Sequence, residues 1–93
     1  MIISTITIQL YAPWVHSLKE KRMIVKSLCS KLKNKFNISV IESAEQDTHQ
    51  TIIISIAFLS TNKSLSDSIL EKILLFIESN TEAQITNIKQ EIY

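Results

Sequence analysis

The chain has 93 residues, of which 45% are hydrophobic and 20% are charged, and its formal net charge is +1. These values are typical of one small globular domain, so we expect residues 1–93 to form a single domain. The near-neutral charge excludes a histone-like polycation and an acidic disordered tail. The absence of glycine excludes phosphate-binding loops, dinucleotide fingerprints and nucleophile elbows, which need glycine at fixed positions.

Cysteine and histidine usage is sparse. Cys29 is the single cysteine, which excludes a disulfide within the chain and a cysteine-based zinc cluster. His16 and His49 are far apart in sequence and show no metal-ligand spacing, so we predict no metal and no cofactor.

The first residues lack the features of a signal peptide, and the longest apolar run, 52–59, covers less than half a membrane span. We therefore expect a cytoplasmic protein that does not engage a membrane.

The first two predicted elements are a strand and a helix. Residues 2–10 alternate between apolar and polar side chains, which is typical of a half-buried strand. A loop that contains Pro13 follows. Ser17 and Glu20 match the capping-box pattern at a helix start. The helix is predicted over 17–35, with an apolar stripe made of Leu18, Val25, Leu28, Cys29, Leu32 and Phe36.

A second strand and a hairpin follow this helix. Ile38 and Val40 indicate the second strand, and the polar stretch 42–50 indicates the hairpin connection. The run 51–59 is apolar on both faces, which predicts a central strand.

The last two predicted elements are another helix and another strand. The segment that begins at Ser64 is typical of a helix start, and the predicted helix ends near Glu78. Residues 83–93 predict the last strand, and Ile85 is out of phase with the later isoleucines, which indicates a bulge. The buried stripe of the helix is expected to contain Leu65, Ile69, Ile73, Phe76 and Ile77.

The order strand, helix, strand, strand, helix, strand predicts an α+β fold. Two right-handed crossovers with a hairpin between them give a ferredoxin-like βαββαβ sandwich, in which a four-stranded antiparallel sheet carries both helices on one face. The other face should be partly apolar, which favours a homodimer through this face or through an edge strand. Its expected residues are Ile3, Thr5, Thr7, Ser39, Ile41, Ile53, Ser55, Ala57 and Leu59.

Charge is divided unequally along the chain. Residues 1–41 carry a net +6 and residues 42–93 a net −5. All seven basic side chains of the first part lie on or just beyond the first predicted helix. One interpretation is a solvated helix face. The other is a surface for an anionic partner, on which Lys19, Arg22, Lys26 and Lys33 follow one flank of the helix at about 100° per residue.

The helix macrodipole divides this basic cluster into two groups. Lys31, Lys33 and Lys35 lie near the C-terminus of the helix, where positive charge is favoured. The first two turns disfavour positive charge by about 0.3–1 kcal/mol for each group. We therefore predict that the basic residues there face an anionic partner, together with Lys26 on the same flank. The predicted anion-binding or RNA-binding set is Lys19, Lys21, Arg22 and Lys26.

Two alternatives compete with this prediction. Asp67, Glu71 and Glu78 form an acidic face on the second helix, so two copies could pair basic to acidic surfaces. Asp47 and His49 in the hairpin could form an acid–base pair, but no nucleophile or pocket accompanies them, so we predict no enzyme and no small-molecule substrate.

The aromatic residues Tyr11 and Trp14 flank Pro13, close to the start of the first helix. They either pack the loop, or one of them stacks on a base near the Lys19 and Arg22 cluster.

Several short motifs resemble a known family. These are Pro13 before the element Ser-Leu-Lys-Glu-Lys-Arg at 17–22, the sequence Val-Lys-Ser-Leu at 25–28, Phe36-Asn37, Ser39-Val40, Gln46-Asp47 and Gln50. Together they resemble the YlxP-like family of small bacterial proteins over nearly the whole chain. The resemblance implies a ferredoxin-like fold in the bacterial cytoplasm. Genes of this family often lie among those for transcription termination, translation initiation and ribosome maturation.

The sequence therefore leaves two alternative functions. The first is a non-enzymatic accessory protein that associates with ribosomal RNA or a ribosomal subunit through Lys19, Lys21, Arg22 and Lys26. Four phosphate contacts predict that a plot of the logarithm of the binding constant for single-stranded RNA against the logarithm of the salt concentration has a slope of about −3. The alternative is a homodimeric structural or regulatory protein-interaction module without a nucleic-acid role.

Overall fold

The computed structural model describes residues 1–44 and 48–93. Asp47, one half of the acid–base pair considered above, therefore lies outside the described residues. The elements are β1 (Ile2–Tyr11), α1 (Leu18–Lys35), β2 (Ser39–Ala44), β3 (Thr51–Ser60), α2 (Lys63–Asn80) and β4 (Gln84–Ile92). This order confirms the predicted sequence of strands and helices.

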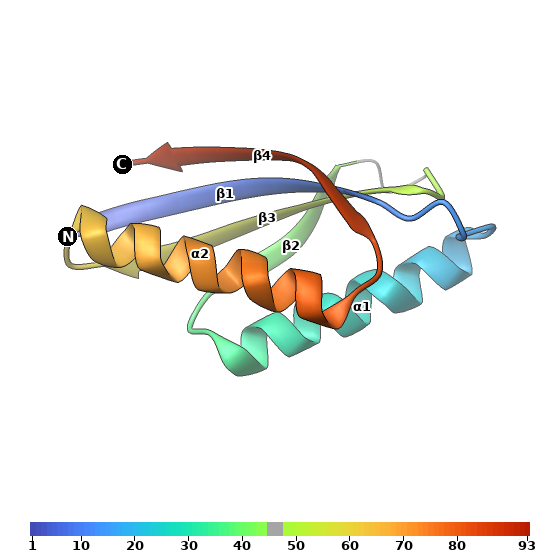
Figure 1. Cartoon of the computed structure of the whole chain (residues 1–93), viewed down its shortest axis with the longest axis horizontal. Coiled ribbons are helices and arrows are strands. Elements are labelled where there is room, and N and C mark those ends of the chain that lie inside the picture. The colour runs from blue at the N-terminus through green and yellow to red at the C-terminus, as the bar shows by residue number, and fades with distance from the viewer. Residues whose placement is uncertain (45–47) are drawn as a thin grey trace.

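The four strands form one antiparallel sheet in the order β2-β3-β1-β4. The long strands β1 and β3 occupy the centre, and both helices lie on the same side of the sheet (Figure 1). The backbones of Ile3 and Tyr93 exchange two hydrogen bonds, so β4 is held beside β1 up to the end of the chain. This arrangement confirms the ferredoxin-like α+β fold.

The predicted bulge is present between β1 and β4. Gln9 lies opposite Asn87 and Leu10 lies opposite Ile85, so Thr86 is the extra residue. The hydroxyl of Thr86 donates a hydrogen bond of 3.3 Å to the carbonyl oxygen of Gln9. The bulge brings Ile85 into phase with the buried face of β1, which explains its displaced position in the sequence pattern.

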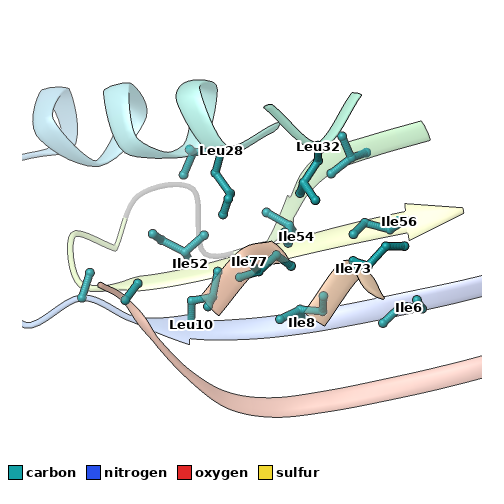
Figure 2. Packing of buried hydrophobic residues seen from close by; sticks show 14 of the residues in the cluster. Ile6, Ile8, Leu10, Leu28, Leu32, Ile52, Ile54, Ile56, Ile73 and Ile77 are labelled. Carbon is teal, nitrogen blue, oxygen red and sulfur yellow. The ribbon is translucent and has the colours of Figure 1, made fainter. Parts of the chain in front are cut away.

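The hydrophobic core lies between the helices and one face of the sheet. Alternate residues of the two central strands are fully buried, and both helices add side chains on the side of the sheet that they cover (Figure 2). Cys29 is partly buried against this cluster, as expected for a small core residue. The largest apolar side chains that are fully buried are Ile6, Ile8, Leu10, Val15, Leu32, Ile52, Ile54, Ile56, Ile73 and Ile77.

Side chains cap both helices at their first turns. The hydroxyl of Ser17 accepts a hydrogen bond of 3.1 Å from the backbone N–H of Glu20, as the capping pattern predicts. The predicted start of α2 at Ser64 is wrong. Asn62 is the N-cap, and its side-chain oxygen accepts the Leu65 N–H at 2.8 Å. Asparagine caps a helix as well as serine does, so the helix begins earlier.

The buried stripe of α2 also differs from the prediction at its first member. Leu65 is 43% exposed, so its placement in the stripe was wrong. Its neighbour Ser66 faces the sheet instead and is fully buried, where its hydroxyl shares a hydrogen bond with the hydroxyl of Ser4 on β1. A serine is tolerated in the core here because the opposite strand supplies a polar partner.

Candidate nucleic-acid interface

The exposed cations of α1 follow one line along the helix. Lys19, Arg22 and Lys26 are spaced by three and four residues, and Lys33 continues the line two turns later. We call the first three of these residues, Lys19, Arg22 and Lys26, the basic stripe. All four are exposed, because the residues that contact the core, such as Leu28 and Leu32, lie on the other side of the helix.

Lys21 is not part of this surface, which corrects the predicted set. Its side chain is only 1% exposed, and its ammonium lies 3.1 Å from the carboxylate of Glu42 on β2, which is itself 16% exposed. Lys21 precedes Leu28 by seven residues, which is two turns, so it projects from the buried side of α1. Its charge serves an ion pair inside the fold and is not available to a partner.

A signal for this ion pair was present in the sequence. Lys21 is placed four residues before Val25, in line with the apolar stripe of the helix. Glu42 follows Val40 by two residues, so the two side chains point to the same buried face of β2. Two opposite charges at core-facing positions of two elements predict a pair, but only after the two elements are known to be neighbours.

Cys29 lies between the basic stripe and this ion pair. Burial raises the pKa of its thiol, the attraction of Lys33 lowers it in part, and the carboxylate of Glu42 raises it further. The net rise keeps the thiol protonated and poorly nucleophilic near neutral pH. Cys29 therefore contributes packing rather than chemistry to this flank.

The loop between β1 and α1 holds Trp14 at the start of the helix. Ala12 and Val15 are fully buried on either side of it. The side-chain amide of Gln50 donates hydrogen bonds to the carbonyl oxygens of Pro13 at 2.9 Å and Val15 at 3.4 Å. These contacts fix the loop, while 39% of the Trp14 surface is exposed.

Trp14 lines a pocket of about 310 Å³ where the end of α2 lies beside α1 (Figure 1). Tyr11, the other aromatic residue considered for stacking, pairs with Thr51 at the end of the sheet and is absent from this lining. The lining residues are Trp14, Met23, Ile24, Ser27, Leu28, Asn80, Thr81 and Glu82.

Comparison with known families matches residues 3–90 to the family described as "Protein of unknown function (DUF503)". The chain belongs to this family. It is also 37% identical over 75 residues to "Uncharacterized protein YlxP" from Bacillus subtilis (strain 168), an alignment that covers 81% of this chain and 82% of that relative. Both findings confirm the YlxP-like resemblance.

Among solved structures, the DUF503 chain is similar to one called "De novo designed protein Foldit4". The TM-score is 0.51 at 14% sequence identity, and the alignment covers 99% of this chain and 94% of that one. At this identity the likeness concerns the fold alone. Within residues 1–44 and 48–93, neither helix has the length and apolar content that a membrane crossing requires. The same residues contain no cluster of three or more metal-ligating side chains.

The open face of the sheet combines apolar and polar side chains, as predicted. Ile41 and Leu59 are 62% and 60% exposed, and Ile3 is also exposed. Beside Ile41 in the strand register, the hydroxyl of Ser55 donates a hydrogen bond of 2.8 Å to Ser43 and lies 3.4 Å from the hydroxyl of Thr7. A shallow hollow of about 360 Å³ lies over this polar centre.

Proposed function

We propose that this protein is a non-enzymatic accessory protein that binds RNA or a ribosomal subunit through the basic stripe of α1. The observation that supports this most is the exposure of Lys19 and Arg22 near the start of the helix. The macrodipole disfavours cations at that position, so a sequence shaped by stability alone would place acids there. An anionic partner would reverse this penalty.

The stripe has the chemistry of phosphate recognition. Arg22 presents a planar fork of donors that suits a phosphate, and Lys19 and Lys26 supply compact charges one turn away on either side. With Lys21 buried, three phosphate contacts remain at this end of the helix. The binding constant for single-stranded RNA should therefore depend less steeply on salt concentration, with a log–log slope of about −2 in place of about −3.

Charge reversal at the two ends of α1 tests this proposal. We expect Lys19→Glu combined with Arg22→Glu to weaken binding to ribosomal subunits and to labelled single-stranded RNA by about tenfold or more at low salt. Lys33→Glu combined with Lys35→Glu makes the same change in net charge at the other end of the helix and is the matched control. We expect it to weaken binding much less.

Fluorescence anisotropy across a salt series measures both effects. Equal losses in the two double variants would show a diffuse basic surface without a preferred site. Absence of binding to RNA and to ribosomal subunits at low salt would overturn the proposal.

A second candidate function is a homodimeric structural or regulatory module that pairs through the open sheet face. The exposure of Ile41 and Leu59 on that face supports it, because exposed apolar patches commonly mark interfaces. We expect sedimentation at micromolar concentration to give twice the 10.6 kDa mass of one chain, and Leu59→Lys to abolish this species. Leu75→Lys is the matched control, since Leu75 is equally exposed but lies on α2. A monomer in the unaltered protein would overturn the dimer.

A further inference from the structure

We propose that the pocket beside Trp14 binds an unpaired nucleobase of an RNA strand whose phosphates contact neighbouring lysines of α1. This inference rests on the proposed RNA-binding function and specifies how the strand is held. The pocket volume of about 310 Å³ lies at the lower end of the range for small-ligand sites. Its lining combines an aromatic ring, apolar side chains and a few polar groups, which is the composition that a flat heteroaromatic ring requires.

The indole of Trp14 is presented in a fixed position. Buried residues anchor the loop on both sides of it, and Gln50 ties the loop backbone through Pro13 and Val15. The ring is nevertheless more than one-third exposed and forms a wall of the pocket. A ring carried on an anchored backbone loses less conformational entropy when a base stacks on it than a ring on an unattached loop would, so more of the stacking energy contributes to binding.

Lysine side chains border the α1 wall of the pocket. Met23 and Ser27 belong to that wall. Lys19 and Lys26 lie four residues before and three residues after Met23, and Lys31 lies four residues after Ser27. Residues three or four apart are neighbours on a helix surface, so all three cations lie one turn from the pocket. All three are exposed, and they are placed to contact the phosphates that flank a stacked base.

The opposite wall is also held in place by hydrogen bonds. The side-chain amide of Asn80 donates to the carbonyl oxygen of Phe76 at 2.8 Å. The hydroxyl of Thr81 accepts from the backbone N–H of Ala83 at 3.1 Å. Glu82 completes this wall and adds a carboxylate. A carboxylate accepts hydrogen bonds from the amino group of cytosine, which uracil lacks. The site should therefore prefer cytosine to uracil.

Trp14 is the only tryptophan of the chain, so its fluorescence reports directly on the pocket. The test titrates the full chain with three labelled RNA octamers: oligocytidylate, oligouridylate and an abasic octamer with the same phosphates. We expect oligocytidylate to quench Trp14 fluorescence and to bind about tenfold tighter than the abasic octamer. The abasic octamer should bind through its phosphates without quenching.

Variants of the chain separate the contribution of base stacking to RNA affinity from that of charge. Trp14→Ala should weaken oligocytidylate binding by about tenfold and leave abasic binding unchanged, and Trp14→Phe should retain most of the affinity. Tyr11→Ala is the control, because Tyr11 is similarly exposed but lies at the end of the sheet. Glu82→Gln should reduce the preference for cytosine over uracil.

The possible outcomes distinguish this site from the broader function. Equal, unquenched binding of oligocytidylate and the abasic octamer would overturn the base pocket and leave the phosphate-binding function standing. Absence of binding by every octamer at low salt would overturn both. Quenching by oligocytidylate in the unaltered protein supports the pocket without reliance on how any variant folds.

Discussion

The two helices have the same length of 18 residues and cover the same face of the sheet, yet different polar contacts attach their first turns. In α1 the polar contact is made by Lys21, which forms an ion pair with Glu42 on an edge strand. In α2 it is Ser66, which shares a hydrogen bond with Ser4 on a central strand. Each buried stripe therefore begins with a polar side chain whose partner lies on the sheet, and continues with apolar ones.

The two contacts differ in the free energy that the fold loses when one partner is removed. A buried charge left alone retains a large desolvation penalty, whereas a buried hydroxyl left alone retains a smaller one. The stem of Lys21 is also fully buried, so it packs as well as pairs. We infer that removing one polar partner destabilises the attachment of α1 more than that of α2, while buried apolar side chains hold both helices to the sheet.

The largest effect is expected from Lys21→Met. Removing the Lys21 ammonium from beside the Glu42 carboxylate should lower the free energy of unfolding by about 3–5 kcal/mol, measured by urea denaturation. The double variant Lys21→Met with Glu42→Met should recover most of this loss, because no charge then remains buried.

An exposed ion pair provides the control for this prediction. Lys63 and Asp67 lie 3.1 Å apart with side chains 70% and 51% exposed, so Lys63→Met should change the stability by less than about 1 kcal/mol. Similar losses for Lys21→Met and Lys63→Met would contradict the importance assigned to the buried pair.

An intermediate effect is expected from Ser66→Ala. The hydroxyl of Ser4 would remain buried without its present partner, which should cost about 1–3 kcal/mol in thermal or urea unfolding. Adding Ser4→Ala should cost less than the sum of the two single changes, since both polar groups are then absent. Ser64→Ala is the control on the exposed side of the same turn and should change little. Additive single and double losses would show that the two hydroxyls do not interact.

Long regular patterns made most of the fold predictable from the sequence. The alternation in 2–10 and 51–59 marked the two central strands, and the displaced Ile85 marked the bulge. Two of the errors share one physical cause. Lys21 was interpreted as a surface charge and Ser66 was passed over in favour of Leu65, because the partners that make burial possible lie on other elements.

The candidate site was predictable only in part for the same reason. Helical spacing placed Lys19, Arg22 and Lys26 on one exposed line without knowledge of the rest of the fold. The pocket beside Trp14 was not predictable, because its other wall comes from Asn80, Thr81 and Glu82. Those residues are far away in sequence and reach Trp14 only through the packing of α2 beside α1.

The smallest effects are expected at the helix ends, where α1 and α2 differ again. The last turn of α1 carries Lys33 and Lys35, whereas the last turn of α2, a helix described in full, has no basic residue. Lys33→Glu should lower the stability by a few tenths of a kcal/mol, up to about 1, by opposing the macrodipole. Lys19→Glu, at the other end of α1, should leave it unchanged or raise it slightly, and Glu78→Lys should stabilise α2 by a similar small amount. Urea unfolding at low salt resolves these differences, and they should shrink at high salt because exposed charges are then screened. If Lys19→Glu were as destabilising as Lys33→Glu, Lys19 would hold an ion pair within the fold. It would then have to be removed from the basic stripe, as Lys21 was removed from the predicted binding set.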